Sequence, residues 1–264
     1  MALVFGRIPL TKTTTLAIKT ILVSQPKPEG DKSPYFDLAD KYKLKIDFRP
    51  FIKVEGVDPK EFRTQKIDIS THTAIILTSK VGVDHFFRMA EAMRFEVPDT
   101  MKYFCITEAV ALYLQKYVTY RKRKIFFGKQ TIDELAELMK KQKGEKFLLP
   151  CTDILRDTIP LTLEKYNIPF TKAILYRTVA ADLSDLEDVY YDMLVFFSPG
   201  GIESLFKNFP DFKQNTTSIA AFGPTTANAV LKNNLRLDVH APHPKAPSMV
   251  GAIELFIKEQ LKKK

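Results

Sequence analysis

The sequence predicts an α/β protein built on parallel sheets. Short apolar runs with β-like character alternate along the chain with longer amphipathic stretches, and this alternation is typical of parallel α/β sheets. The chain has 264 residues, enough for about two domains at roughly 150 residues each. Apolar residues make up 45% and charged residues 27%, so the composition can supply a buried core and excludes wholesale disorder.

Six apolar runs are predicted as buried strands. In chain order they are residues 75–78, 103–106, 124–127, 147–149, 195–197 and 219–222. Residues 132–141 are predicted as a helix, because Ile132, Leu135 and Leu138 recur at helical spacing. Two further runs, 45–55 and 172–180, alternate β-branched and aromatic residues and are predicted as extended, with Pro50 at an edge position.

The two halves of the chain repeat the same order of segments. Four pairs align: 21–23 with 147–149, 41–46 with 165–170, 76–87 with 195–206, and 104–109 with 222–227. The last two pairs lie at nearly equal offsets of 119 and 118 residues. Any two α/β halves share some likeness, but four units kept in order favour an internal duplication.

The net charge of +9 is concentrated in a few places. Both ends of the chain are basic, and residues 116–129 hold six basic residues and no acid. A nucleic-acid protein needs a basic face interleaved with stacking aromatics, so a solvated loop is the favoured interpretation of residues 116–129. The longest apolar runs, such as 193–197, are far shorter than the roughly 20 residues of a membrane span. Residues 1–19 are expected to form a loose N-terminal extension, with a transit peptide as the alternative because the segment is basic, rich in threonine and free of acids.

The cysteines and histidines offer little catalytic chemistry. Cys105 and Cys151 are too few for a disulfide framework and suit a reducing compartment, and Cys151 is expected to be an inert buried thiol. His240 and His243 lie among prolines and are favoured as loop residues over metal ligands. His72 and His85 have no partner visible in the sequence. No Ser-His-Asp set can be placed.

Three strand-to-helix turns are the candidate binding sites. They are Ser198-Pro199-Gly200-Gly201, Gly223-Pro224-Thr225-Thr226 and Thr78-Ser79-Lys80. Parallel sheets bind ligands beyond the carboxyl ends of their strands, where the free N–H groups of helix starts attract anions. Ser198 is placed to cap its helix, and Pro224 suits a first helical turn. Plain helix starts would look much the same, and the glycine spacing excludes a P-loop and a dinucleotide fingerprint.

Four motifs in order resemble the uroporphyrinogen-III synthase family. They are Phe147-Leu148-Leu149-Pro150-Cys151, Leu175-Tyr176-Arg177-Thr178-Val179, Phe196-Phe197-Ser198-Pro199-Gly200-Gly201 and Ala221-Phe222-Gly223-Pro224-Thr225-Thr226-Ala227. The resemblance covers about residues 20–258. It implies two flavodoxin-like domains joined by a two-stranded β-ladder linker. One domain would hold residues 20–44 and 180–264, the other 56–171, with residues 45–55 and 172–179 as the linker strands.

The resemblance also implies an activity. Members of the family are hydro-lyases that close hydroxymethylbilane, a linear tetrapyrrole, with loss of water and inversion of ring D. The expected product is uroporphyrinogen III, a precursor in heme biosynthesis. The resemblance implies no metal or organic cofactor, and it implies a cytoplasmic monomer without a nucleic-acid or membrane partner.

Site residues follow from the resemblance as expectations. Tyr176 is expected to donate a proton to the leaving hydroxyl, although a packed interdomain aromatic would explain it equally well. The substrate-binding residues are expected to be Ser198, Gly200, Gly201, Gly223, Pro224, Thr225 and Thr226 from one domain, with Ser79 and Lys80 from the other.

The chain departs from the family pattern in its first half. Lys80 stands where a proline is usual, and Glu108 stands where a threonine is expected. These departures leave two alternatives open. One is a non-catalytic relative that binds a tetrapyrrole or a regulatory partner, and the other is a nucleic-acid-binding α/β protein that uses residues 116–129.

Overall fold

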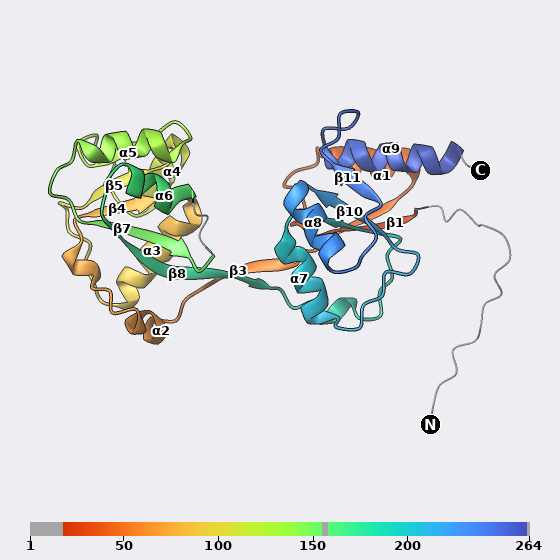
Figure 1. Cartoon of the computed structure of the whole chain (residues 1–264), viewed down its shortest axis with the longest axis horizontal. Helices are drawn as coiled ribbons and strands as arrows, with labels where there is room; N and C mark the ends of the chain where they lie inside the picture. Colours follow the sequence, from red (N-terminus) through yellow and green to blue (C-terminus); the bar gives the residue numbers. More distant parts are fainter. Residues whose placement is uncertain (1–17, 155–157, 263–264) are drawn as a thin grey trace, which may run out of the picture. The chain divides into compact units, whose positions relative to one another are not determined.

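The computed structural model describes residues 18–154 and 158–262. The chain forms two compact units, each with its own sheet (Figure 1). Of the described residues, the first unit holds 18–53 and 179–262, and the second unit holds 54–154 and 158–178. The boundaries between the units fall inside two strands, β3 (Ile52–Gly56) and β8 (Phe170–Ala180). Of the predicted extension 1–19, only Ile18 and Lys19 lie within the described residues.

The first unit carries a five-stranded parallel sheet in the order β11-β10-β9-β1-β2. Its strands are β1 (Thr20–Val23), β2 (Lys45–Phe48), β9 (Met193–Phe196), β10 (Ser218–Phe222) and β11 (Val239–Ala241). Its helices are α1 (Pro34–Tyr42), α7 (Pro199–Asn208), α8 (Pro224–Lys232) and α9 (Met249–Lys262). Counted along the chain, the strand order is 2-1-3-4-5, which is the flavodoxin-like order.

The second unit carries the sheet β3-β8-β7-β4-β5-β6. Beside β3 and β8, its strands are β4 (Ala74–Leu77), β5 (Lys102–Cys105), β6 (Ile125–Phe127) and β7 (Phe147–Thr152). The ladders from β8 to β6 are all parallel. Its helices are α2 (Pro59–Thr64), α3 (Lys80–Ala92), α4 (Glu108–Tyr113), α5 (Ile132–Lys140) and α6 (Thr158–Lys165). The six predicted strands and the predicted helix 132–141 are therefore confirmed.

Each sheet is covered by helices on both faces, because successive residues of a buried parallel strand point to opposite sides. In β9, Met193 and Val195 pack with the α1 and α9 side, while Leu194 and Phe196 pack with the α7 and α8 side. The second unit repeats this division, with α3 and α4 against one face and α5 and α6 against the other. Strands buried on both faces explain why the sequence shows continuous apolar runs.

The segments that align in the sequence repeat hold equal places in the two sheets. The pairs β1 with β7, β2 with β8, β4 with β9, and β5 with β10 occupy matching positions when β2-β1-β9-β10-β11 is set beside β8-β7-β4-β5-β6. The duplication itself stays a prediction.

The predicted linker strand 45–55 is wrong for its first part. Residues 45–48 form β2, which pairs in parallel with β1 inside the sheet of the first unit. A separate strand, β3, begins at Ile52 and is the neighbour of β8. Pro50 lies between them, and because it lacks an N–H and has a restricted backbone it ends the ladder there. None of the helices in the described ranges has the length and apolar character to cross a membrane.

Candidate functional site

Tyr176 and Ser79 meet at the carboxyl edge of the second unit's sheet. Ser79 is the N-cap of α3, and its Oγ accepts the backbone N–H of Gly82 at 3.0 Å. Tyr176 lies on β8, two strands away from β4, in register with Thr152 of the intervening β7. Its phenol lies within hydrogen-bonding reach of the Ser79 side chain, an interaction that lowers the pKa of Tyr176. The structure thus brings together two residues that the sequence placed in the site separately.

The surroundings of Tyr176 keep its phenol protonated. Burial raises the pKa of Tyr176, the nearby Cys151 thiol adds to this, and only the hydrogen bond with Ser79 acts in the opposite direction. Because the Ser79 oxygen already accepts the Gly82 N–H, its hydroxyl hydrogen is available to the phenol oxygen. A Ser79 hydroxyl that donates to the phenol oxygen leaves the Tyr176 hydrogen for a ligand. This arrangement can deliver a proton to a leaving group.

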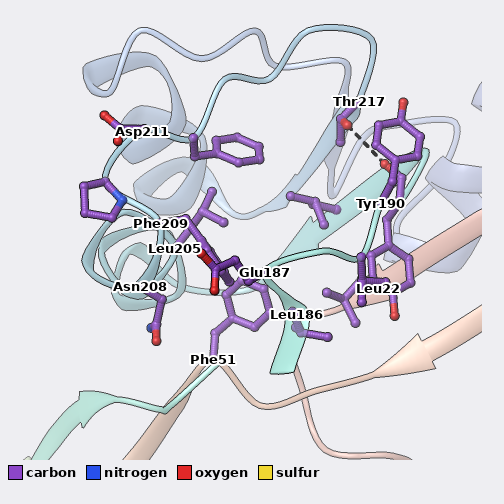
Figure 2. A pocket seen from close by; sticks show the side chains of 15 residues that line it. Leu22, Phe51, Leu186, Glu187, Tyr190, Leu205, Asn208, Phe209, Asp211 and Thr217 are labelled. Atoms are coloured by element: carbon purple, nitrogen blue, oxygen red, sulfur yellow. Dashed lines mark hydrogen bonds between the residues drawn. The ribbon is translucent and has the colours of Figure 1, made fainter. Parts of the chain in front are cut away.

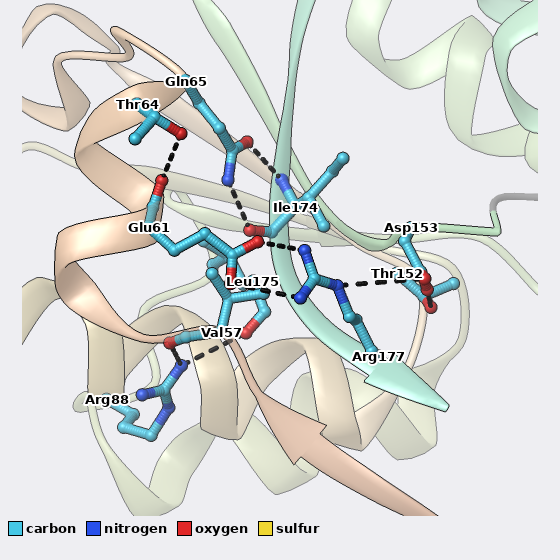
Figure 3. A network of polar contacts seen from close by, with 10 residues as sticks. All are labelled: Val57, Glu61, Thr64, Gln65, Arg88, Thr152, Asp153, Ile174, Leu175 and Arg177. Atoms are coloured by element: carbon cyan, nitrogen blue, oxygen red, sulfur yellow. Dashed lines mark hydrogen bonds and ion pairs between the residues drawn. The ribbon is translucent and has the colours of Figure 1, made fainter. Parts of the chain in front are cut away.

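A polar network holds β8 on both sides of Tyr176 (Figure 3). The Gln65 amide pairs with the backbone of Ile174, donating to its carbonyl at 2.9 Å and accepting its N–H at 3.0 Å. The Arg177 guanidinium makes an ion pair with Glu61 of α2 and lies 3.9 Å from the Asp153 carboxylate. The strand residues before and after Tyr176 are therefore anchored to α2 and to the end of β7.

The other predicted residues of this edge are exposed. The Lys80 ammonium lies 5.4 Å from the centre of the Tyr113 ring, and Glu108 is the first residue of α4, next to its N-cap Thr107. Lys80 can attract a carboxylate. Glu108 places a negative charge at the start of α4.

The two glycine turns of the first unit are neighbours, because β9 and β10 pair in parallel. The prediction that Ser198 caps its helix is wrong in one respect. Ser198 occupies the N-cap position of α7, but its side chain makes no capping hydrogen bond. Gly223 is the N-cap of α8 with φ of 82° and ψ of 157°, a conformation almost confined to glycine. The prediction that Pro224 stands in the first turn is confirmed.

The predicted binding residues of these two turns differ in how far they are exposed to solvent. Thr225 is exposed and Gly200 is half-buried, whereas Gly201 is buried against the Phe196 ring. Thr226 is only 1% exposed, so its side chain belongs to the core. The backbone N–H groups of Thr225 and Thr226 lie in the first turn of α8, where a helix has no carbonyl partner for them. The turn therefore offers an anion the Thr225 hydroxyl and N–H donors.

A separate cavity of about 360 Å³ lies at the opposite edge of the first unit's sheet (Figure 2). Its walls come from the end of α7 and from the loops that precede β9 and β10, including Leu205, Phe209 and Tyr190. The charged groups lining it are the acids Glu187 and Asp211, and among the described residues none of the lining side chains is basic. The cavity does not suit a polycarboxylate and contains none of the predicted site residues.

His85 is the residue that the sequence reasoning missed. Its imidazole stacks on the Tyr176 ring with centroids 5.1 Å apart, and its Nδ1 accepts a hydrogen bond from Arg88 Nε at 3.2 Å. His85, which has no partner visible in the sequence, therefore has two in the structure, Tyr176 and Arg88. The separation of three residues between His85 and Arg88 on one helix is the signal that could have revealed the pair.

The cysteines and the potential metal ligands show no catalytic or metal-binding arrangement in the described part of the chain. Burial raises the pKa of the Cys105 thiol to about 12 and that of Cys151 to about 11, so both stay protonated. Among the described residues, no three His, Cys, Asp or Glu side chains gather closely enough to hold a metal ion.

Comparisons with known proteins agree on one family. A family model described as uroporphyrinogen-III synthase HemD matches residues 37–251. A uroporphyrinogen-III synthase from Saccharomyces cerevisiae is 29% identical over 139 residues, which cover 47% of this chain and 50% of the relative. The chain thus spans about half the length of the curated relative that it matches.

Solved structures extend the comparison to the whole fold. A uroporphyrinogen-III synthetase from Helicobacter pylori has a TM-score of 0.55 and 16% identity, covering 92% of this chain and 100% of that one. A mutant uroporphyrinogen III synthase from Thermus thermophilus has a TM-score of 0.47 and 17% identity, covering 93% and 100%. The Helicobacter structure shows the shared fold.

Proposed function

This chain belongs to the uroporphyrinogen-III synthase HemD family, and on that premise we propose that it converts hydroxymethylbilane to uroporphyrinogen III. The reaction closes a linear tetrapyrrole, releases water and inverts ring D. The family match over residues 37–251 carries the proposal. The Tyr176 phenol, hydrogen-bonded to Ser79 at the start of α3, supports it with a group suited to proton donation.

Tyr176 is proposed as the acid that protonates the leaving hydroxyl. Loss of water leaves an azafulvene cation, and the substituted α-carbon of ring D attacks it to form a spiro-pyrrolenine. The bond from that carbon to its original methylene bridge then breaks, the methylene bonds the free α-carbon of ring D, and that carbon loses a proton to give the inverted ring. A phenol already carries its proton near neutral pH, and burial raises the pKa of Tyr176 further, so donation depends on its position against the leaving hydroxyl. No charge remains on the substrate oxygen, because it departs as water.

The helix starts are proposed to hold the substrate carboxylates. The substrate class carries eight carboxylates, and each helix start stabilises an anion by about 0.3–1 kcal/mol, so several must act together. In the first unit the donors would be Ser198, the N–H of Gly200 and the Thr225 hydroxyl with its neighbouring N–H groups. In the second unit they would be the backbone N–H groups beside Ser79 at the start of α3 and the Lys80 ammonium.

Selectivity is proposed to come from positioning. Spontaneous closure gives the uninverted isomer, so the enzyme must favour the attack that inverts ring D. A 100-fold preference needs only about 2.7 kcal/mol of differential stabilisation. Fixed orientation of the reacting ends can supply that without a strong acid or base.

A cytoplasmic monomer without a nucleic-acid partner, metal or organic cofactor is part of the same proposal. Within the basic segment, Lys116 lies 3.4 Å from the Asp84 carboxylate and Arg121 lies 3.9 Å from that of Asp99. These contacts support the interpretation of residues 116–129 as a solvated part of the second unit rather than a nucleic-acid surface.

A coupled assay tests the proposal. Hydroxymethylbilane is generated enzymatically in place, the protein is added, and the oxidised porphyrin isomers are separated by chromatography. Isomer III in excess of the no-enzyme level is the expected result. Isomer I alone would overturn the proposal and favour a non-catalytic relative. Salt-dependent affinity for random DNA, unaffected by tetrapyrrole, would favour the nucleic-acid-binding alternative.

A further inference from the structure

His85 faces the proposed proton donor directly. Its ring is nearly parallel to that of Tyr176, with an angle of 20° between the planes and 5.1 Å between the centroids. We propose that His85 is a positioning residue that fixes the Tyr176 phenol for proton donation through a neutral imidazole stacked on it. The inference rests on the proposed function, because the orientation matters only if Tyr176 gives up a proton.

The hydrogen bond from Arg88 determines which form of the imidazole is present. A guanidinium has donors and no acceptor, so the Arg88 Nε–H that lies 3.2 Å from His85 Nδ1 requires a lone pair on that nitrogen. The proton of the neutral ring is then on Nε2. An imidazolium would carry hydrogen on both nitrogens and could not accept from Arg88. The contact therefore selects a neutral ring in a single tautomer.

Arg88 is itself held in place by the backbone around Tyr176. Its Nη2 donates to the Val57 carbonyl at 2.8 Å and to the Leu175 carbonyl at 3.2 Å (Figure 3). Leu175 immediately precedes Tyr176 on β8. A Cβ added at Gly56 would lie 2.6 Å from the guanidinium carbon, so the absence of a side chain there leaves room for Arg88. The guanidinium thereby links β8 to the face of α3 that carries His85.

Burial and the neighbouring Arg88 guanidinium oppose protonation of the His85 imidazole. Burial and the positive charge of Arg88 lower the pKa of His85, while Asp84 acts in the opposite direction. The Asp84 carboxylate is already engaged, because it accepts hydrogen bonds from Tyr113, Tyr117 and Lys116. On β8 the group that faces His85 is the Tyr176 phenol, which is protonated and neutral. Acid would place a second positive charge beside Arg88 and remove the acceptor that aligns the imidazole.

Steady-state kinetics of His85→Ala and His85→Phe test the role. Loss of an aromatic stacking interaction of ordinary strength corresponds to a change of about tenfold in rate. His85→Ala is therefore expected to lower kcat about tenfold, while KM changes less than about twofold. His85→Phe keeps a flat ring over Tyr176 and is expected to recover kcat to within about threefold. His72→Ala is the matched control, because His72 precedes β4 at the opposite edge of the sheet and bonds the Asp68 carbonyl.

The pH profile separates positioning from a merely structural contribution. In the unsubstituted enzyme, kcat is expected to fall at a pH below 6.5, the ordinary His value, as His85 takes up a proton. His85→Phe cannot titrate and should lose this acid limb, while His72→Ala should keep it. An unchanged kcat in His85→Ala overturns the proposal, and so does an acid limb that persists in His85→Phe.

A spectroscopic readout distinguishes failure of this role from failure of the proposed function. In the full chain labelled with ¹³C-tyrosine, the Tyr176 ring signal is assigned by its absence in Tyr176→Phe. It should shift with a midpoint below pH 6.5, and the shift should vanish in His85→Ala. If the enzyme makes isomer III but the signal does not titrate, only the inference fails. If the signal titrates but no isomer III forms, the proposed function fails and the role in catalysis with it.

Discussion

The chemistry proposed at Tyr176 depends on side chains that come from three parts of the chain. Ser79 and His85 lie on or beside α3, Cys151 lies on β7, and Tyr176 lies on β8. Each neighbour acts differently on the phenol. Ser79 hydrogen-bonds its oxygen, Cys151 contributes to its raised pKa, and His85 covers one face of its ring.

Replacing Tyr176 by phenylalanine is expected to lower kcat at least about 100-fold, the smallest contribution usual for a positioned acid. KM should change less than about twofold, because the ring and its stack on His85 remain. The free energy of unfolding should change by only about 1 kcal/mol, since one hydrogen bond to Ser79 is lost. The measurements are steady-state kinetics of isomer III formation and urea unfolding.

Tyr166→Phe is the matched control, because Tyr166 precedes β8 at the other edge of the same sheet. Turnover that is unchanged in Tyr176→Phe would remove this tyrosine from the mechanism and leave it as a packed aromatic.

At the scale of elements, helix starts that look alike in the sequence differ in what they offer. The Ser79 side-chain oxygen accepts a hydrogen bond from the Gly82 N–H, whereas the Ser198 side chain makes no capping hydrogen bond to α7. Gly223 has no side chain and contributes a backbone conformation instead. The Ser198 hydroxyl of the first unit is thus not used in capping its helix, and the second unit contributes the Tyr176 phenol.

The contact between α1 and α9 predicts a pH dependence of stability. Glu254 on α9 accepts hydrogen bonds from Lys41 at 2.7 Å and from Tyr42 at 3.1 Å, and it lies 3.1 Å from Lys258. The Lys41 hydrogen bond, followed by those of Lys258 and Tyr42, lowers the pKa of Glu254 from 4.5 to about 2. The folded state therefore favours the ionised carboxylate, and its contribution is complete above pH 4.5. The contribution declines as the pH falls toward 2, because the unfolded chain takes up the proton first.

Glu254→Gln is expected to lower the free energy of unfolding at pH 7 by about 1 kcal/mol, the upper range for a solvent-accessible ion pair. Its stability should also fall less steeply than that of the unsubstituted protein between pH 5 and pH 2. Urea unfolding across this range is the measurement. Glu259→Gln, an exposed position on the same helix, is the control and should retain the steep decline. Identical acid profiles for Glu254→Gln and the unsubstituted protein would contradict the assignment.

At the scale of the whole molecule, each unit has its own core. The buried clusters of the first unit contain no residue of the second, and the reverse also holds for the described residues. Within residues 18–154 and 158–262, the chain crosses between the units only at residues 53–54 and 178–179. The units are therefore expected to lose stability separately.

Phe196→Ala in the first unit and Phe104→Ala in the second provide a matched pair, because both rings are fully buried in sheet cores. Each substitution is expected to cost its own unit about 3–5 kcal/mol. Hydrogen exchange followed by mass spectrometry should show the loss of protection only in peptides of the substituted unit. Equal loss in both units after either substitution would show a single cooperative core.

The sequence alone was sufficient for six of the strands, the helix over residues 132–141, the α/β class and the turns that end β4, β9 and β10. These features depend on periodicity and on local backbone chemistry, which a few neighbouring residues decide. The family motifs also singled out Tyr176 and Ser79. The break of residues 45–55 into β2 and β3 was foreshadowed by Pro50, but the pairing of β2 with β1 depends on a strand some 25 residues away.

Only the tertiary structure decided which of these residues meet. Tyr176 lies 97 residues from Ser79 and 91 from His85 along the chain, and strand order across β4, β7 and β8 brings them together. Burial likewise divided adjacent threonines, exposing Thr225 and placing Thr226 in the core. The physical reason is that contacts between distant segments follow from how helices and strands pack, and local sequence periodicity carries no record of that packing.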